Sequence, residues 1–474
     1  MIPPRKVGLR FERLRRDSKG CLQLKRIGGR FYVHRVTSER GDGGRVVKIS
    51  EHVGAITADG VFVGKKTAGH VRESKREVYE YGNAALAHSL LSDAESILKE
   101  AGDVPCYREL IACALIRAIA PSPIRLLESR WERFHLSRTM RVNLSPGHVS
   151  DVLRDAGRHV TWWYRLFSKL SSEGGLLLYD LTTIFAYSGS IKLAEKGYNP
   201  DHRYIDQIGV VMAFSCKDAL PVGADVFYGS VKDISTIRDF LERLPDEARE
   251  KGVGFILDRG FTSYELLEDF RKEGIGYIVP LKKNSKLLKM DEVGWRDAPF
   301  LYRKRPVRWA SMESPPYGRL YVFEDPEFRG VEEAALLRRV ERKEFEERRR
   351  VAGVIGMLSD MEVSGPKMYD LYKGREDVEL TFDATLDADR TYLQSPDGVR
   401  GFFLVMFLAM RVYFKILKRR RERKLTSRVS VEEVLFELSK VERIVEKNGR
   451  EYYASIPKKA RNMLSLFSDM MRMG

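Results

Sequence analysis

The strongest constraint on the fold is an aspartate inside a short apolar run. Residues 176–187 read Leu-Leu-Leu-Tyr-Asp-Leu-Thr-Thr-Ile-Phe-Ala-Tyr, so Asp180 interrupts the run. A segment this rich in apolar, aromatic and β-branched residues is typical of a buried strand. A carboxylate there is costly unless it is hydrogen-bonded, paired or bound to a cation. Taken alone, Asp180 fits a structural role at a strand end as well as a functional role.

A second segment of the same kind favours the functional role. Residues 252–261 read Gly-Val-Gly-Phe-Ile-Leu-Asp-Arg-Gly-Phe, and their apolar run ends at Asp258. From residue 174 the pattern predicts three strands, a helix, a strand, a helix and a strand. After the first strand, these elements are expected at 208–214, 222–228, 235–244, 255–257, 263–272 and 276–281. This order predicts an α/β chain with a ribonuclease-H-like mixed sheet, in which three antiparallel strands form a meander and later strands add parallel to the first.

A third carboxylate is expected on a helix that follows residue 366. Tyr372, Arg375 and Glu379 are spaced i, i+3 and i+7, so they share one helix face, and Val378 and Phe382 beside it can pack on a sheet. Arg375 lies four residues before Glu379, so the two side chains can pair. An ordinary surface ion pair on an amphipathic helix is the alternative interpretation.

Asp180, Asp258 and Glu379 together make a coherent metal site. Three converging carboxylates repel each other unless divalent cations neutralise them. Oxygen-only ligands suit Mg²⁺ or Mn²⁺. Two such ions, about 3.5–4 Å apart, activate a water or a 3′-hydroxyl and stabilise the leaving oxygen in phosphoryl transfer. The sequence therefore predicts two ions at one site.

These motifs resemble those of the DDE transposases of bacterial and archaeal insertion sequences. The similar subgroup has a Tyr-x2-Arg-x3-Glu-x6-Lys signature and a β-rich insertion before the glutamate. Here the signature holds Tyr372, Arg375 and Glu379, with Leu386 at the position of its lysine. The other matching stretches are Tyr179-Asp-Leu-Thr-Thr-Ile-Phe, Asp258-Arg-Gly-Phe, and the linker from Gly197 to Asp206-Gln.

The resemblance implies a role for each of these residues. Asp180 and Asp258 would bridge the metal ions, and Glu379 would complete the second ion's site. Tyr372 and Arg375 would hold the phosphates of the transposon end. Further DNA contacts are expected from Arg259, and from Lys282 and Lys283, for which a solvated pair is the alternative.

The remaining regions suggest DNA-binding parts around the core. The first 30 residues hold ten Lys or Arg and are followed by short alternating segments, which predicts a basic β-rich module that lies on DNA or is simply solvated. Residues 145–167 could form a helix-turn-helix with a turn at Ala156-Gly157. Their aromatic residues, Trp162, Trp163 and Phe167, favour plain core. The basic run 418–424, with Arg419, Arg420 and Arg421, is a candidate phosphate-binding segment.

The expected organisation has six parts. The parts are a basic β-rich module (1–66), a helical region (67–173), the first part of the core (174–286), an insertion with strands (287–365), the second part of the core (366–417) and a basic helical region (418–474).

A final helix is expected at 431–444, within the last of these parts. It carries Leu435, Leu438 and Val441 on one side, which suggests a dimer contact.

Composition limits the class of partner. The formal net charge of +16 favours a polyanion as the partner.

The four cysteines lack metal-type spacing, which indicates a reduced protein with buried thiols. The N-terminus lacks the apolar core of a signal peptide, and the apolar stretch 402–410 is too short to span a bilayer, which takes about 20 residues. We therefore expect a cytoplasmic, nucleoid-associated protein with no membrane partner.

The expected function follows from the site and the resemblance. An active transposase would bind the inverted terminal repeats of its element as a homodimer, cleave the ends and join the 3′ ends to target DNA. A catalytically silent DNA-binding derivative and, less favoured, a structure-specific nuclease of the same fold are the alternatives. The three acidic residues favour the active enzyme.

Overall fold

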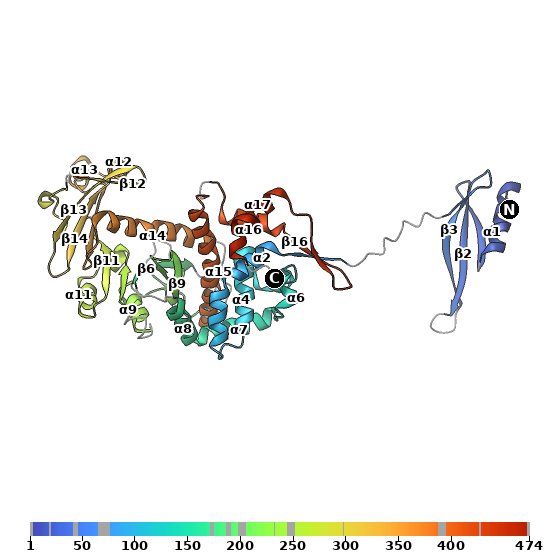
Figure 1. Cartoon of the computed structure of the whole chain (residues 1–474), viewed down its shortest axis with the longest axis horizontal. Coiled ribbons are helices and arrows are strands. Elements are labelled where there is room, and N and C mark those ends of the chain that lie inside the picture. The colour runs from blue at the N-terminus through green and yellow to red at the C-terminus, as the bar shows by residue number, and fades with distance from the viewer. Residues whose placement is uncertain are drawn as a thin grey trace. The chain divides into compact units, whose positions relative to one another are not determined.

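The structure is a computed structural model of the 474-residue chain. It describes residues 3–18, 20–40, 46–64, 76–170, 175–185, 191–197, 205–231, 233–243, 252–296, 298–386, 395–425 and 428–471. The chain divides into two compact units, residues 1–77 with 445–451 and residues 78–444 with 452–474 (Figure 1). Among the described residues no single helix is long and apolar enough to cross a membrane, while one bent pair, Tyr107–Ile119 with Ile124–Trp131, passes the same test of length and composition.

The first unit is a four-stranded antiparallel sheet with a helix that the sequence analysis missed. The strands follow the order β1 (Cys21–Ile27), β2 (Arg30–Arg40), β3 (Val46–Ile56) and β4 (Phe62–Gly64). Helix α1 (Arg5–Asp17) places Val7, Phe11 and Leu14 against the sheet residues Leu22, Phe31, Val33 and Ile56. Its basic residues hid the apolar spacing of those three positions, which is what defines an amphipathic helix. Cys21 is exposed, contrary to the expectation of buried thiols.

The helical region of the second unit is packed as core. Its helices are α2 (Gly82–Leu90), α3 (Ser92–Glu100), α4 (Tyr107–Ile119), α5 (Leu127–Trp131), α6 (Leu136–Thr139), α7 (Pro146–Arg158) and α8 (Val160–Leu170). Helices α2 and α3 are separated only by Leu91, and the region is helical, as the sequence predicted.

The two helices predicted within residues 145–167 are formed, but the turn between them comes later than expected. Helix α7 continues through Gly157 to Arg158, so the turn lies at His159. A Cβ on Gly157 would lie 1.8 Å from the Asp397 carbonyl oxygen, so a neighbouring helix closes this face of α7. The three aromatic residues of α8, Trp162, Trp163 and Phe167, are buried, as the core interpretation predicted.

One mixed sheet organises the second unit. Its central strands are β9 (Leu220–Tyr228), β8 (Asp206–Ser215), β6 (Gly175–Phe185), β10 (Val253–Ile256) and β11 (Gly276–Pro280), in that spatial order. Strands β6, β8 and β9 form an antiparallel meander, and β10 and β11 add parallel to β6. This is the strand order that the sequence predicted. The two-residue strand β7 (Glu195–Lys196) pairs with the start of β8.

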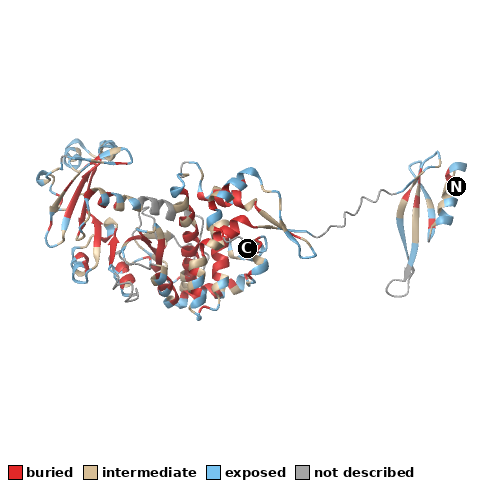
Figure 2. Cartoon of the chain, viewed as in Figure 1, coloured by how far each residue is buried: buried red, intermediate tan, exposed pale blue. Residues whose placement is uncertain are grey.

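Helices cover both faces of these strands. Tyr179 of β6 is fully buried and packs against Phe240 of α9 (Asp233–Arg243) and against Phe261, which precedes α11 (Tyr264–Lys272). On the other face Phe214 packs against Phe414 of α15 (Pro396–Glu422), and α14 (Gly365–Leu386) contacts β6. Figure 2 shows the central strands and much of α15 as buried.

The insertion extends the sheet, although the sequence analysis treated it as a stretch with strands of its own. Strands β12 (Phe300–Tyr302), β13 (Arg305–Glu313), β14 (Arg319–Glu324) and β15 (Val354–Ser359) continue the order, and β15 pairs antiparallel with β11. Helices α12 (Pro326–Leu337) and α13 (Arg342–Arg349) lie between β14 and β15 in sequence. Pairing satisfies the edge of β11, whose backbone donors and acceptors would otherwise need another partner.

The expected dimer contact on the C-terminal helix is not available at the surface. Helix α16 (Val431–Ser439) ends five residues earlier than predicted, and β16 (Glu442–Val445) follows it. Leu435, Leu438 and Val441 are buried within this chain, so they offer no surface to a second copy. Strand β17 (Glu451–Tyr453) and helix α17 (Lys458–Phe467) complete the chain, and β17, β16 and β5 (Glu77–Glu80) form a small sheet.

Candidate active site

Asp180 lies in the middle of the sheet, on strand β6. Its cross-strand neighbour on β8 is Met212, and only 8% of Asp180 is exposed. Tyr179, the preceding residue, faces the α9 side of the sheet, so Asp180 faces the side that α14 and α15 cover. Strand alternation therefore points this carboxylate toward the helix that carries Glu379.

Asp258 follows the neighbouring parallel strand, β10. The register of β10 with β6 runs to Ile256 opposite Leu178. Two further residues bring Asp258 level with Asp180 and onto the same face, and adjacent strands lie about 4.8 Å apart. The two acidic residues that the sequence singled out are thus neighbours at one point of the sheet.

The phenylalanine of the Asp-Arg-Gly-Phe motif, Phe261, has a structural role. Phe261 is 1% exposed, and its ring packs 5.3 Å from that of Tyr179. A short turn over Arg259–Phe261 follows Asp258, and the Phe261 amide donates to the Asp258 carbonyl oxygen over 3.0 Å. The buried ring therefore anchors the turn and fixes where Asp258 leaves the sheet. Arg259 is half-buried in this turn.

Helix α14 brings Arg375 onto Asp258. The Arg375 guanidinium forms an ion pair with the Asp258 carboxylate, and the Arg375 side chain is only 13% exposed. Its carbon Cζ lies 5.7 Å from the ring centroid of Tyr372, which is itself buried. Arg375 is therefore not an exposed surface residue, because its side chain is enclosed, and it pairs with the aspartate that follows β10.

Glu379 lies on α14 one turn after Arg375, as the helical spacing predicted. Its side chain falls outside the described residues, as do those of Val378, Phe382 and Leu386 and most of the predicted linker after Gly197. The predicted pairing of Arg375 with Glu379 and the packing of Val378 and Phe382 thus remain predictions.

The insertion holds the start of α14 in an aromatic socket that the sequence analysis missed. Tyr369 is fully buried, and its ring contacts Phe300, Tyr302 and Phe323 at centroid distances of 5.6, 5.1 and 5.1 Å. The Tyr369 hydroxyl donates to Asp325 over 3.2 Å. Burial raises the pKa of the Tyr369 phenol and the Asp325 carboxylate raises it further, so the hydroxyl remains a donor at neutral pH.

Two further contacts tighten this socket. Asp325 is 1% exposed and caps α12 by accepting from the Glu327 and Phe328 amides. Gly365, the first residue of α14, lies so close to Trp309 that an added Cβ would come within 2.2 Å of its ring. The sequence signals were an Asp-Pro helix start at Asp325 and a tyrosine three residues before Tyr372.

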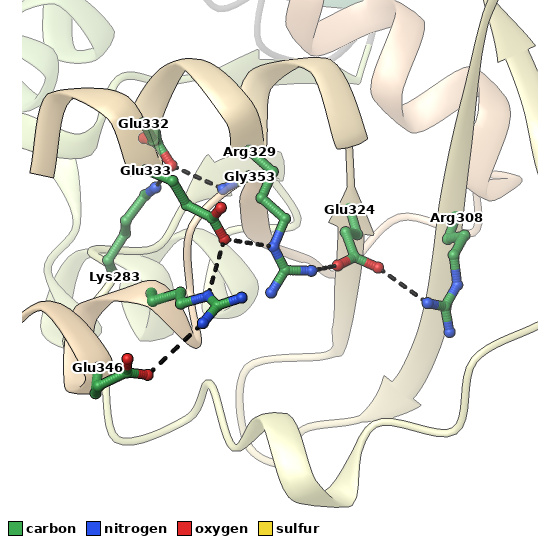
Figure 3. A network of polar contacts seen from close by, with 9 residues as sticks. Lys283, Arg308, Glu324, Arg329, Glu332, Glu333, Glu346 and Gly353 are labelled. Carbon is green, nitrogen blue, oxygen red and sulfur yellow. Dashed lines mark hydrogen bonds and ion pairs between the residues drawn. The ribbon is translucent and has the colours of Figure 1, made fainter. Parts of the chain in front are cut away.

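Lys283 connects the core to the insertion. It forms an ion pair with Glu332 of α12, which also accepts from the Gly353 amide over 2.8 Å (Figure 3). Beside it in the insertion, a chain of ion pairs runs from Glu333 through Arg329 and Glu324 to Arg308. Lys283 is therefore not the solvated side chain that was the alternative to DNA binding, whereas Lys282 is exposed.

The basic run at the end of α15 is partly used by the fold. Arg420 is 7% exposed, and Arg419 forms ion pairs with Glu422 and Asp469. Arg421 is exposed. Of the three arginines expected on phosphate, Arg421 is thus the one placed at the surface.

The donor set at the site fits a hard divalent cation. Asp180 and Asp258 offer only oxygen, the ligand type that Mg²⁺ and Mn²⁺ prefer. Within the part of the chain that the structure describes, no three His, Cys, Asp or Glu side chains could hold an ion together, and the third expected ligand, Glu379, is outside that part. Arg375 offsets the charge of Asp258, so cation binding must compete with this guanidinium or share the carboxylate with it.

Comparison with known proteins gives a family match. Residues 172–411, about half of the 474 residues, match the family model described as "Transposase DDE domain". No curated protein matches the chain. A solved structure that is similar to it is the cryo-EM structure of the piggyBac transposase synaptic complex with hairpin DNA, at 11% identity and a TM-score of 0.34, covering 82% of this chain and 76% of that one.

Proposed function

Because this chain belongs to the DDE transposase family, we propose that it cuts the ends of its own insertion sequence and joins the 3′ ends to target DNA. The observation that carries the proposal is the meeting of three elements at one point of the sheet. Asp180 lies on β6, Asp258 follows the parallel strand β10 by two residues, and α14 pairs Arg375 with Asp258 and carries Glu379 one turn further. The matched region, residues 172–411, contains all of them.

In this proposal the sheet is a ribonuclease-H-like core, supported by the antiparallel meander and the two parallel strands beside it. Asp180, Asp258 and Glu379 would hold two Mg²⁺ or Mn²⁺ ions. When bound, such ions activate a hydroxyl nucleophile and stabilise the leaving oxygen of a phosphodiester. The subgroup with the Tyr-x2-Arg-x3-Glu signature is part of the same proposal.

The chain's own residues would orient the DNA and the ligands. Arg375 presents a planar, permanently charged group beside Asp258, where it can orient that carboxylate and donate to a neighbouring phosphate oxygen. The Tyr372 ring packs against the guanidinium and limits its rotamers. The aromatic socket in the insertion holds the start of α14, and this would set the distance of Tyr372 and Arg375 from the sheet.

The partners and location follow from the same function. We infer that the partners are the inverted terminal repeats and target DNA, that two copies act together on two ends, and that the protein works in the cytoplasm on the nucleoid. The net charge of +16 supports a polyanionic partner.

The test is cleavage of DNA carrying the inverted repeats that flank the gene. We expect the purified chain to nick the repeat ends with Mg²⁺ or Mn²⁺ and to leave them intact with a chelator. Repeat-specific binding without any metal-dependent cleavage would contradict the enzyme and support a catalytically silent binding protein.

A further inference from the structure

The two-residue loop between β12 and β13 has a backbone conformation that its residues disfavour. Tyr302 pairs with Arg305, which leaves Arg303 and Lys304 as the loop, with φ of 47° and 71°. Hairpin loops with two successive positive φ values favour Asn-Gly, because residues with a Cβ are strained there. Long basic side chains at both positions therefore lower stability, and such strain is retained where the side chains serve another purpose.

The tip of this hairpin is exposed and basic. Arg303 and Lys304 are exposed, and the neighbouring Leu301 is 75% exposed. The Arg303 guanidinium carbon lies 5.2 Å from the centroid of the Tyr302 ring, at the base of the tip. Arg305, at the base of the hairpin, forms ion pairs with Asp325 and Glu327, both at 3.4 Å. The two tip residues are thus exposed on a hairpin whose base is held by ion pairs.

The base of the hairpin is the socket that holds α14. Tyr302 packs on Tyr369 of α14, and Asp325 binds both Arg305 and the Tyr369 hydroxyl. Tyr369 lies one turn before Tyr372 on α14. The hairpin tip and the helix that carries Arg375 therefore share one buried support.

We propose that Arg303 and Lys304 bind the phosphodiester backbone of the DNA on which this transposase acts, at a point fixed relative to α14. The inference rests on the proposed function. Two adjacent cations on a rigid tip match successive phosphates, and phosphate contacts set the position of a duplex without reading its sequence. The contact would hold the DNA in register with the carboxylates under α14.

The test replaces the tip by the residues that its backbone favours. In the full-length chain, Arg303→Asn with Lys304→Gly removes two charges and relieves the strain. We expect an unchanged or higher melting temperature, about tenfold weaker binding to end DNA and to random DNA, and a slope of log K against log salt that is smaller by about 1.8, or about 0.9 for each phosphate contact. A purely structural tip would move the melting temperature and leave the salt slope unchanged.

Two matched variants decide the outcome. Arg303→Gln with Lys304→Gln removes the same charges and keeps the strained backbone, so it should lose the same affinity without the gain in melting temperature. Arg338→Gln with Arg339→Gln removes two exposed charges elsewhere on the insertion and should keep most of the affinity and the slope. Wild-type affinity and slope in both tip variants, or equal losses in the Arg338/Arg339 variant, would overturn the inference. A wild-type chain that fails to bind DNA at all would instead contradict the proposed function.

Discussion

Asp180 and Asp225 are two buried aspartates of one sheet that lie on its opposite faces. Asp180 is 8% exposed and Asp225 is 4% exposed. Asp225 of β9 pairs with Val211 of β8, and Val211 pairs with Leu181 of β6, so these three side chains lie on one face of the sheet. Leu181 is two residues after Tyr179 on β6, so Asp225 also lies on the face of Tyr179. There the Tyr164 hydroxyl of α8 donates to it over 2.6 Å, and the Val226 amide donates over 2.8 Å.

The face of Asp180 is built differently. It is crossed by α14, which brings a guanidinium to Asp258 and carries a further carboxylate, Glu379, one turn on. A hydroxyl and a backbone amide donate to Asp225, whereas a guanidinium pairs with Asp258, the acidic residue that follows the strand next to that of Asp180. Burial alone therefore does not separate a proposed catalytic aspartate from a structural one, and the two faces differ in the groups that the covering helices carry.

The largest expected effect comes from the same change made on each face. Asp180→Asn should slow single-turnover cleavage of end DNA with Mg²⁺ at least about a thousandfold, a barrier increase of about 4 kcal/mol, because an amide would replace a carboxylate that the proposed function assigns to the metal ions. Asp258→Asn and Glu379→Gln should behave alike, and end binding should persist in all three.

The matched control for this change is Asp225→Asn, which keeps the shape of the side chain and one acceptor oxygen. It should cleave within about twofold of wild type, a barrier change of about 0.4 kcal/mol. Near wild-type cleavage by Asp180→Asn would remove that residue from the site, and a collapse of cleavage in a folded Asp225→Asn would erase the distinction between the two faces.

A stability effect is expected on the Tyr164 side alone. Tyr164→Phe removes the hydroxyl donor from a buried carboxylate, which should lower the free energy of unfolding by about 1–3 kcal/mol. Urea denaturation measures this loss, and the metal dependence of cleavage should stay as in wild type. A shift in the Mg²⁺ concentration needed for half-maximal cleavage would show that the Tyr164–Asp225 pair is coupled to the site.

The smallest expected effect sharpens the role of the guanidinium. Arg375→Lys keeps the charge beside Asp258 but loses the planar fork. We expect normal folding and cleavage at least about tenfold slower, a barrier change of about 1.4 kcal/mol. A thermal melt and single-turnover cleavage on one preparation make the comparison, with Lys367→Arg, an exposed side chain in the first turn of the same helix, as a control. Unchanged cleavage would leave Arg375 as a structural ion-pair partner of Asp258.

Much of the catalytic region follows from local sequence patterns. The alternation of short apolar runs and amphipathic helices determined the order of strands β6, β8, β9, β10 and β11, and both aspartates were placed correctly at buried strands. The spacing of Tyr372, Arg375 and Glu379 determined one helix. These features depend on the periods of strand and helix, which neighbouring residues encode directly.

Only the tertiary structure decided which side chains meet. It paired Arg375 with Asp258, tied Lys283 to Glu332, used Arg419 for an ion pair with Asp469 and buried the face of α16 that includes Leu438 within the chain. It also joined the insertion to the edge of β11. The ion pairs and the strand pairing join residues far apart in the sequence, which a local pattern does not relate. For α16, the amphipathic pattern predicts that one helix face is covered, but it does not identify the segment that covers it.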